Sequence, residues 1–293
     1  MANTQDIRRR IKSIRNTAQI TKAMQMVAAS KMRKAQQHAL AGRPYSDLMN
    51  RVLVSLKGRT DPLLHPLLQV RPMRKELVLV VSTDKGLAGA LNTNLMREAI
   101  AFDAEKTIYV TAGRKARQFV ARAKRHMLAS FELKDAPTII ETKPVSRFCL
   151  EKFLTGEVDK VTVLYTHFIN TINQKPVAQT LLPISEFAFR STAKGNEAPE
   201  ESPSDPLLGY VFEPSAEAVL DFMLPYYVQY QVYQMILDAR ASEHSARMVA
   251  MKNATDNANQ FIKDLTLEYN KMRQASITTE LLEISTAQMA VGG

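Results

Sequence analysis

Several features that would indicate a membrane-spanning, secreted or disulfide-bonded protein are missing from this chain. Its single cysteine, Cys149, excludes an internal disulfide framework and a zinc site built from cysteines, and it fits a reducing compartment. No uninterrupted apolar run approaches the roughly 20 residues of a transmembrane helix. The basic start is followed by no apolar stretch, so we expect neither a secretory signal nor a transit peptide. The 45% hydrophobic and 23% charged residues predict a folded chain with a core.

Phosphate-binding and metal-binding motifs are also missing. The chain has neither GxxxxGK[ST] nor GxGxxG, and no two of its five histidines have the i, i+4 spacing of a helical metal site. Residues 84–92 (DKGLAGALN) follow a predicted strand and precede a predicted helix, where a phosphate loop would lie. Two glycines three residues apart are a weak signal, so we predict a tight, closely packed turn there. We therefore expect no catalytic, cofactor-binding or metal-binding residues.

Positive charge is concentrated at one end of the sequence. The whole chain carries a net charge of +10, and residues 1–59 alone carry +11, from 13 Lys and Arg against 2 Asp and Glu. Such a segment favours an acidic partner, which can be nucleic acid, anionic lipid or an acidic protein surface. The alternative is a solvated basic helix face without a partner.

The N-terminal segment has the pattern of a long helix. Apolar, small and polar residues alternate at steps of four and three, as in a coiled-coil seam: Ile7, Ile11, Ile14, Ala18, Thr21, Gln25, Ala28, Met32, Ala35 and Ala39. Most of these side chains are small, so two backbones can approach closely while little apolar area is buried. Gly42 and Pro44 predict a kink.

The C-terminal segment also predicts a long helix. Residues 226–289 contain no proline or glycine and would extend about 95 Å as one helix. A second seam is predicted at Phe261, Leu265, Met272, Ala275, Thr279, Leu282, Thr286 and Met289. The simplest packing joins the two terminal helices as an antiparallel coiled-coil stalk.

Between the helices, strand and helix patterns alternate. Strands are predicted at 76–83, 107–111, 160–168 and 177–184, and helices at 87–102, 114–124 and 145–154. The last two strands suit an antiparallel hairpin. The fold class is therefore α/β, with a mostly parallel sheet, plus a long antiparallel helical coiled coil. We predict a helix at 1–59, a central domain at 70–190, a linker at 191–209 and a returning helix at 210–293. The linker segment is acidic and rich in Ser and Pro.

Long segments at both ends resemble one family. Residues 20–33 (ITKAMQMVAASKMR) closely resemble the N-terminal helix of the gamma subunits of F-type ATP synthases, in their bacterial form. Residues 243–259 (EHSARMVAMKNATDNAN) and 269–280 (YNKMRQASITTE) resemble that family's C-terminal helix, and residues 82–94 (STDKGLAGALNTN) resemble its first strand-to-helix turn. The resemblance covers essentially the whole chain. The regulatory cysteine pair of chloroplast members is not matched.

This resemblance implies the function of a rotor. The family's gamma subunit is a central shaft, one per complex, inside a ring of alternating alpha and beta subunits, and its foot rests with the epsilon subunit on the membrane c-ring. Proton or sodium flow turns the shaft, which drives the catalytic beta sites through their conformational cycle. The resemblance thus implies a non-catalytic, peripheral membrane protein on the cytoplasmic face of the bacterial inner membrane. Motif matches imply beta-subunit contacts at Met24, Arg273, Gln274 and Thr278.

Two alternatives remain open on the residues alone. A coiled-coil nucleic-acid-binding protein would also have a basic helix, although here Lys22, Lys31 and Arg33 lie along the same span as the seam and not beyond it. A small-molecule enzyme would use the turn near Gly86 and would need a pocket with converging polar groups.

Overall fold

The computed structural model describes residues 4–57, 65–184, 212–213 and 215–291, and these form two compact units. Unit 1 comprises Met1–Ala28 and Arg247–Gly293, and unit 2 comprises Ala29–Ala246. The predicted linker at 191–209 lies outside the described residues. Among the described helices, none combines the length and the apolar character needed to cross a membrane.

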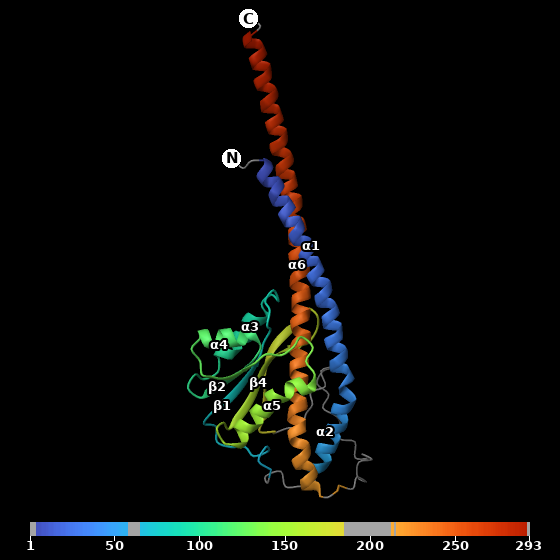
Figure 1. The fold of residues 1–293 in the computed structure, drawn as a ribbon, viewed down its shortest axis with the longest axis vertical. Coiled ribbons are helices and arrows are strands. Elements are labelled where there is room, and N and C mark those ends of the chain that lie inside the picture. Colours follow the sequence, from blue (N-terminus) through green and yellow to red (C-terminus); the bar gives the residue numbers. More distant parts are fainter. Residues whose placement is uncertain (1–3, 58–64, 185–211, 214, 292–293) are drawn as a thin grey trace. The chain divides into compact units, whose positions relative to one another are not determined.

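Unit 1 is an antiparallel pair of helical segments (Figure 1). One belongs to α1 (Thr4–Ala41) and the other to α6 (Ala216–Val291). All ten predicted seam positions of α1 are buried or half-buried, and within unit 1 the most buried are Ile7, Ala18 and Ala28. Across the seam, the hydroxyl oxygens of Thr21 and Thr255 lie 2.7 Å apart. The predicted N-terminal seam is therefore confirmed.

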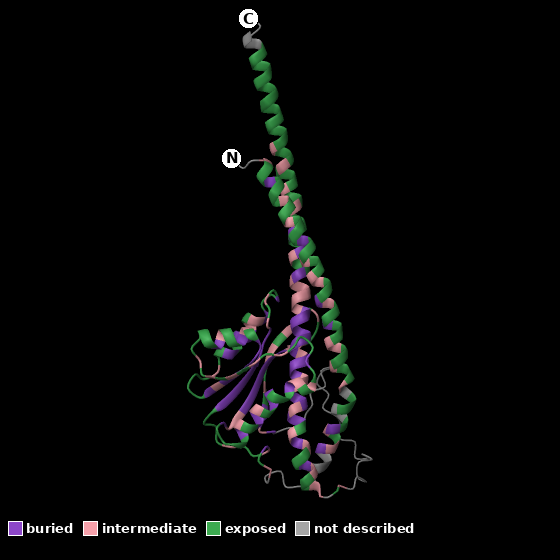
Figure 2. Cartoon of the chain, viewed as in Figure 1, coloured by how far each residue is buried: buried purple, intermediate pink, exposed green. Residues whose placement is uncertain are grey.

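The predicted seam of the C-terminal helix is correct only in part. Phe261 is 60% exposed, whereas Ile262 and Tyr269 are half-buried, and Leu265 and Met272 are half-buried as predicted. From residue 273 to residue 288 every residue of α6 is exposed, including the predicted seam residues of that stretch (Figure 2). The reason is that α1 begins at Thr4, so no described residue of α1 remains to cover this part of α6.

Unit 2 contains a five-stranded sheet in the order β3-β2-β1-β4-β5. The strands are β1 (Glu76–Val81), β2 (Thr107–Ala112), β3 (Met127–Phe131), β4 (Lys160–Phe168) and β5 (Gln174–Leu182). All neighbouring pairs are parallel except β4 and β5, which form the predicted antiparallel hairpin. The mostly parallel α/β sheet is thus confirmed. β1 is buried along its whole length, as expected for a central parallel strand.

Helices cover both faces of this sheet. The remaining helices are α2 (Arg43–Lys57), α3 (Leu91–Ile100), α4 (Arg114–Arg122) and α5 (Ile139–Leu154). One apolar core contains residues of α3 and α4 with one side of the sheet. A larger core joins the other side to α2, α5 and the first half of α6. Alternate residues of the strands point to opposite faces, so β1, β2, β3 and β4 each contribute to both cores.

Three local features differ from the sequence-based expectation. β3 was not predicted, because its MLASF sequence is poor in β-branched residues and half-buried at the sheet edge. α3 begins at Leu91, since the left-handed conformations of Leu87 (φ 61°) and Gly89 (φ 58°) exclude a helix before it. α5 begins earlier than predicted, because Thr138 and Glu141 form a capping box that starts the helix at Ile139.

Candidate functional site

Three of the four predicted contact residues lie together on the exposed end of α6. Arg273, Gln274 and Thr278 are all exposed, and the Thr278 hydroxyl donates to the Gln274 carbonyl at 2.9 Å, within the same helix. Large apolar side chains nearby are exposed as well, including Ile277 and Leu281. An uncovered helix that shows both apolar side chains and polar donors has the composition of a protein-binding surface.

Met24 lies in a different place in unit 1. It is half-buried on α1, three residues after Thr21. Thr21 contacts Thr255, which precedes Arg273 by 18 residues, or about 27 Å along an α-helix. Because the two segments are antiparallel, Met24 lies still farther from Arg273. The structure therefore groups Arg273, Gln274 and Thr278 and separates Met24 from them.

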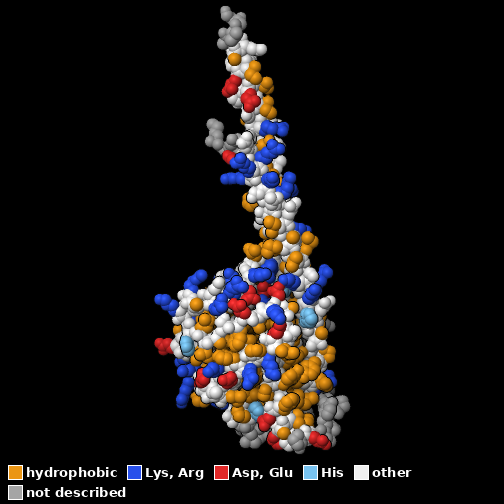
Figure 3. Space-filling model, viewed as in Figure 1, with side chains coloured by type: hydrophobic (Ala, Val, Ile, Leu, Met, Phe, Trp, Pro, Cys, Tyr) orange, Lys and Arg blue, Asp and Glu red, His pale blue; other side chains and the backbone are white. Residues whose placement is uncertain are grey.

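The beginning of α1 carries an exposed basic surface. Its members are Arg8, Arg9, Arg10, Lys12 and Arg15, all exposed. Figure 3 shows Lys and Arg side chains gathered around the start of this helix. Within the part of the chain that the structure describes, none of the five forms an ion pair. Their charge is thus free to interact with acidic groups of another molecule.

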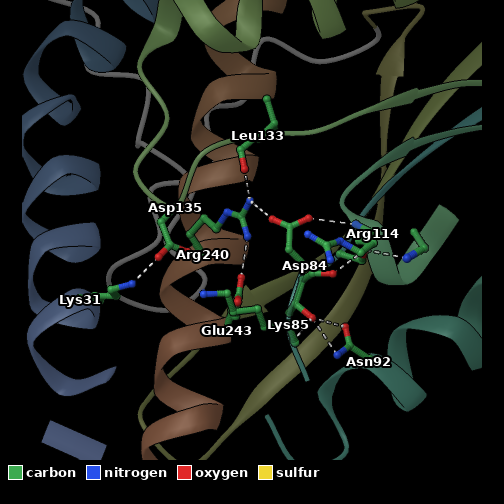
Figure 4. A network of polar contacts seen from close by, with 12 residues as sticks. Lys31, Asp84, Lys85, Asn92, Arg114, Leu133, Asp135, Arg240 and Glu243 are labelled. Carbon is green, nitrogen blue, oxygen red and sulfur yellow. Dashed lines mark hydrogen bonds and ion pairs between the residues drawn. The ribbon is translucent and has the colours of Figure 1, made fainter. Parts of the chain in front are cut away.

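Unit 2 contains a buried polar network centred on Arg240 of α6 (Figure 4). The Arg240 side chain is only 5% exposed. Its Nη1 donates to Glu243 Oε2 at 2.7 Å, and its Nη2 donates to Asp84 Oδ2 and to the Leu133 carbonyl, both at 3.1 Å. Asp84 accepts a further hydrogen bond at Oδ1 from the backbone N–H of Arg114 at 2.9 Å. One guanidinium thus joins α6 to two turns of the α/β domain.

The charges of the network stabilise one another. Burial lowers the pKa of Arg240, but the carboxylates of Glu243 and Asp84 raise it by more, so the guanidinium stays charged. Nearby, Lys31 of α1 forms an ion pair with Asp135. The hydrogen bond from Lys31 lowers the pKa of the Asp135 carboxyl. These groups hold fixed charges and lack the shared proton of a catalytic acid–base pair.

The turn at residues 84–92 is a closed structural element, as predicted. The Thr83 hydroxyl lies 2.7 Å from the Lys85 carbonyl and 2.9 Å from the side-chain nitrogen of Asn92. Asp84 points to Arg240, so α6 residues lie where an enzyme of this topology would bind its substrate. Among the described residues, no group of three or more His, Cys, Asp or Glu could hold a metal ion. These contacts give no support to the small-molecule enzyme alternative.

A groove with a volume of about 460 Å³ lies on the other face of the sheet, between α3 and α4. Three cationic side chains line it, namely Arg97, Lys115 and Arg122, together with apolar Met96 and Phe119. Its lining contains no acidic residue, cysteine or histidine. The groove can attract an anionic group but offers no nucleophile paired with a base.

Sequence reasoning missed the Arg240 network. Arg240 and Glu243 are three residues apart in a buried stretch of α6, a spacing that places opposite charges on one helix face. That spacing was the one signal in the sequence for an ion pair between Arg240 and Glu243. The partners of Arg240 in the domain, Asp84 and Leu133, are more than 100 residues away in the chain, and only the fold brings them close.

Comparison with known proteins places this geometry in context. A protein-family description, "ATP synthase", matches residues 3–291. The ATP synthase gamma chain of Methylacidiphilum infernorum is 52% identical over 297 residues and covers all of both chains. That of Opitutus terrae is 48% identical over 294 residues, with 99% of each chain covered.

Solved structures with the same fold include chains of two mitochondrial ATP synthases. A chain of the Euglena gracilis complex superposes with a TM-score of 0.67 at 21% identity, over 98% of this chain and 94% of that one. A chain of the Tetrahymena thermophila central stalk and c-ring gives a TM-score of 0.59 at 24% identity, over 80% and 99%. At these identities the match concerns the fold alone.

Proposed function

The chain belongs to the family of ATP synthase gamma chains, and on that basis we propose that it is the central rotor shaft of a bacterial F-type ATP synthase. In this function, ion flow turns the membrane c-ring, the c-ring turns the shaft, and the shaft drives the catalytic beta subunits through their conformational cycle. The nucleic-acid-binding alternative finds no support in the comparisons, since the relatives reported above are gamma chains.

The observation that carries the proposal is the construction of unit 1. Two antiparallel segments pack along small and polar seam residues, with Ala18, Thr21 and Ala28 on one helix and Thr255 and Ala258 on the other. Close backbone packing stiffens a helix pair, whereas the outer surface stays largely exposed (Figure 2). A shaft needs this combination, because it must resist twisting while its surface moves past surrounding subunits.

The finer assignments follow from the same proposal. The partners are the alpha and beta subunits around the shaft, the epsilon subunit, and the c-ring, with one copy of this chain per complex. The chain performs no bond chemistry itself, and ATP forms and breaks down in the beta subunits. It is a peripheral membrane protein at the cytoplasmic face of the inner membrane. We place beta-subunit contacts at Met24 and at the exposed group Arg273, Gln274 and Thr278.

Observation of rotation tests this function directly. The complex of this chain with its own alpha and beta subunits is fixed to glass through the beta subunits, and a bead is attached to the chain. Ile172 is 84% exposed in the β4–β5 hairpin, so Ile172→Cys provides an attachment point. Cys149 will not compete for the label, because it is fully buried and burial raises the pKa of its thiol to about 12.

We expect ATP to drive stepwise rotation of the bead in one direction, with pauses at three angles per turn that correspond to the three beta sites. A chain that fails to assemble with alpha and beta subunits, or a bead that only fluctuates when ATP is added, would overturn the proposal. Removal of the chain's last residues from 273 onward serves as the matched comparison. It should weaken rotation by removing the proposed beta contacts while unit 2 stays intact.

A further inference from the structure

The sheet of unit 2 has a ligand-binding topology whose binding crevice is filled by the protein itself. In the order β3-β2-β1-β4-β5, the chain reverses its direction of strand addition between β1 and β4. Open α/β sheets bind their ligands at such a point, outside the carboxyl ends of the strands. Here, residues 238–245 of α6 hydrogen-bond to the carboxyl ends of both strands or to the turns that follow them.

On the β4 side, three α6 residues hold the strand and its hairpin. Asp238 accepts the backbone N–H of Phe168 at 3.1 Å, and its other oxygen lies 2.5 Å from His167 Nδ1. Ser242 donates to the Thr166 carbonyl at 2.9 Å, and Ser245 donates to the Thr171 carbonyl at 2.9 Å. These bonds attach α6 to the end of β4 and to the hairpin that follows it, on one side of the crevice.

On the β1 side, the attachment is ionic. Arg240 contacts Asp84, which lies three residues after the end of β1 and also accepts the first backbone N–H of α4. Both oxygens of this carboxylate are therefore used, and the other terminal nitrogen of the guanidinium donates to Glu243. Hydrogen bonds between a guanidinium and a carboxylate are directional, so they resist sideways displacement.

Apolar packing alone would hold these parts together without fixing their angle. The hydrophobic effect is non-directional and depends on the area removed from water, so small sliding or twisting of α6 along the sheet changes it little. Polar contacts on two sides of one helix behave differently. A twist of α6 about its own axis must stretch the bonds on one side or the other.

We propose that the Arg240–Asp84 contact, in the crevice between β1 and β4, is a torsional lock that fixes the angle between α6 and the α/β domain when the shaft carries torque. This inference rests on the proposed function, because a load of that kind exists only in a rotating complex. Arg240 and Asp84 are positioning residues, and the lock transmits rotation without taking part in catalysis.

The torsional stiffness of the assembled complex tests the lock. The bead on Ile172→Cys reports the angle of the α/β domain, and the spread of that angle during a pause is inversely related to stiffness. In Arg240→Met and Asp84→Asn, we expect an angular variance larger by about twofold or more, since directional ionic contacts supply the stiffness at this place. The stepping pattern under low load should remain.

The matched control is Glu157→Gln. Glu157 forms an ion pair with Lys152 of α5 at 2.7 Å, within the same domain but without α6. The angular variance of the bead on Glu157→Gln should equal that on the parent protein. Equal variance in Asp84→Asn and the parent, or an equal increase in Glu157→Gln, overturns the lock.

Assembly failure and failure of the rotor function are both recognisable. Arg240→Met leaves two carboxylates without their cation and can fail to assemble; Asp84→Asn keeps the Arg240–Glu243 pair, so it decides the question in that case. If the parent bead does not rotate at all, the proposed function fails. If the parent rotates and Asp84→Asn is as stiff as the parent, only the lock fails.

Discussion

The contact between Thr21 and Thr255 offers a direct test of the helix pairing in unit 1. The two hydroxyl oxygens lie 2.7 Å apart across the seam, and each also lies within hydrogen-bond distance of a carbonyl in its own helix, Ala18 for Thr21 and Met251 for Thr255. Because each hydroxyl has one hydrogen, one threonine donates across the seam and the other donates to its own helix. Thr255→Val keeps the shape of the side chain and removes the bond across the seam. The change therefore removes the polar contact between α1 and α6 together with the contact to the Met251 carbonyl within α6.

The expected loss of stability in Thr255→Val depends on which hydrogen-bond partners remain. A hydrogen bond of this kind contributes about 0.5–1.5 kcal/mol to stability. Thr21 keeps the Ala18 carbonyl as its acceptor, so no buried donor is left without a partner, and the lower part of that range applies. Amide hydrogen exchange of residues 7–28 in α1 should become roughly two- to fivefold faster, since 1.4 kcal/mol corresponds to a factor of ten.

Thr279→Val is the matched control. Thr279 makes the same type of bond to its own helix, to the Ala275 carbonyl at 3.0 Å, but it is exposed and no described residue of α1 faces it. Hydrogen exchange followed by mass spectrometry on the two variants compares one side-chain change in two environments. If both variants give the same exchange in residues 7–28, the threonine contact does not hold the helices together and the reasoning fails.

Three further outcomes follow from the structure. Arg273→Ala should leave the melting temperature of the isolated chain unchanged, because the side chain is exposed. The same change should lower the ATP hydrolysis rate of the complex by up to about tenfold, since the loss of a charged hydrogen bond of about 1.4 kcal/mol corresponds to that factor. Equal hydrolysis rates of variant and parent would contradict the proposed contact. Burial lowers the pKa of His65 below its ordinary 6.5, and its Nδ1 accepts the Leu67 N–H, so the neutral form is the folded one. The free energy of unfolding should therefore be highest above pH 6.5, the ordinary pKa that His65 has in the unfolded chain, and fall as the pH drops below it, and His65→Gln should flatten the fall in urea titrations. Cys149 should resist iodoacetamide at neutral pH in the native protein and react once urea unfolds it; native-state modification would show that the α5 side of the core opens.

Much of the fold could be predicted because its signals are local. The KVTVLYTHF run predicts β4 with its observed bounds, since β-branched and aromatic residues suit a buried strand. The small residues at steps of three and four predict the side of α1 that is covered. The resemblance to gamma chains at both ends, and the family it implies, rest on the same linear information.

The register of α6 could not be predicted in this way. A seven-residue repeat fits several apolar sets on a helix this long, and Phe261 belongs to a set that faces water. Which set is covered depends on the side of α6 that faces α1. That side is a property of the packed pair, and neither sequence segment contains it.

The amino-acid sequence by itself determined the family of this protein and, with the exception of β3, its helices and strands, because periodicity and residue type act over a few neighbouring positions. Only the tertiary structure decided that α6 fills the crevice between β1 and β4 and that Arg240 meets Asp84 there. The physical reason is distance along the chain. These two residues are 156 positions apart, and nothing in either one specifies the other until the sheet places the end of β1 beside the helix.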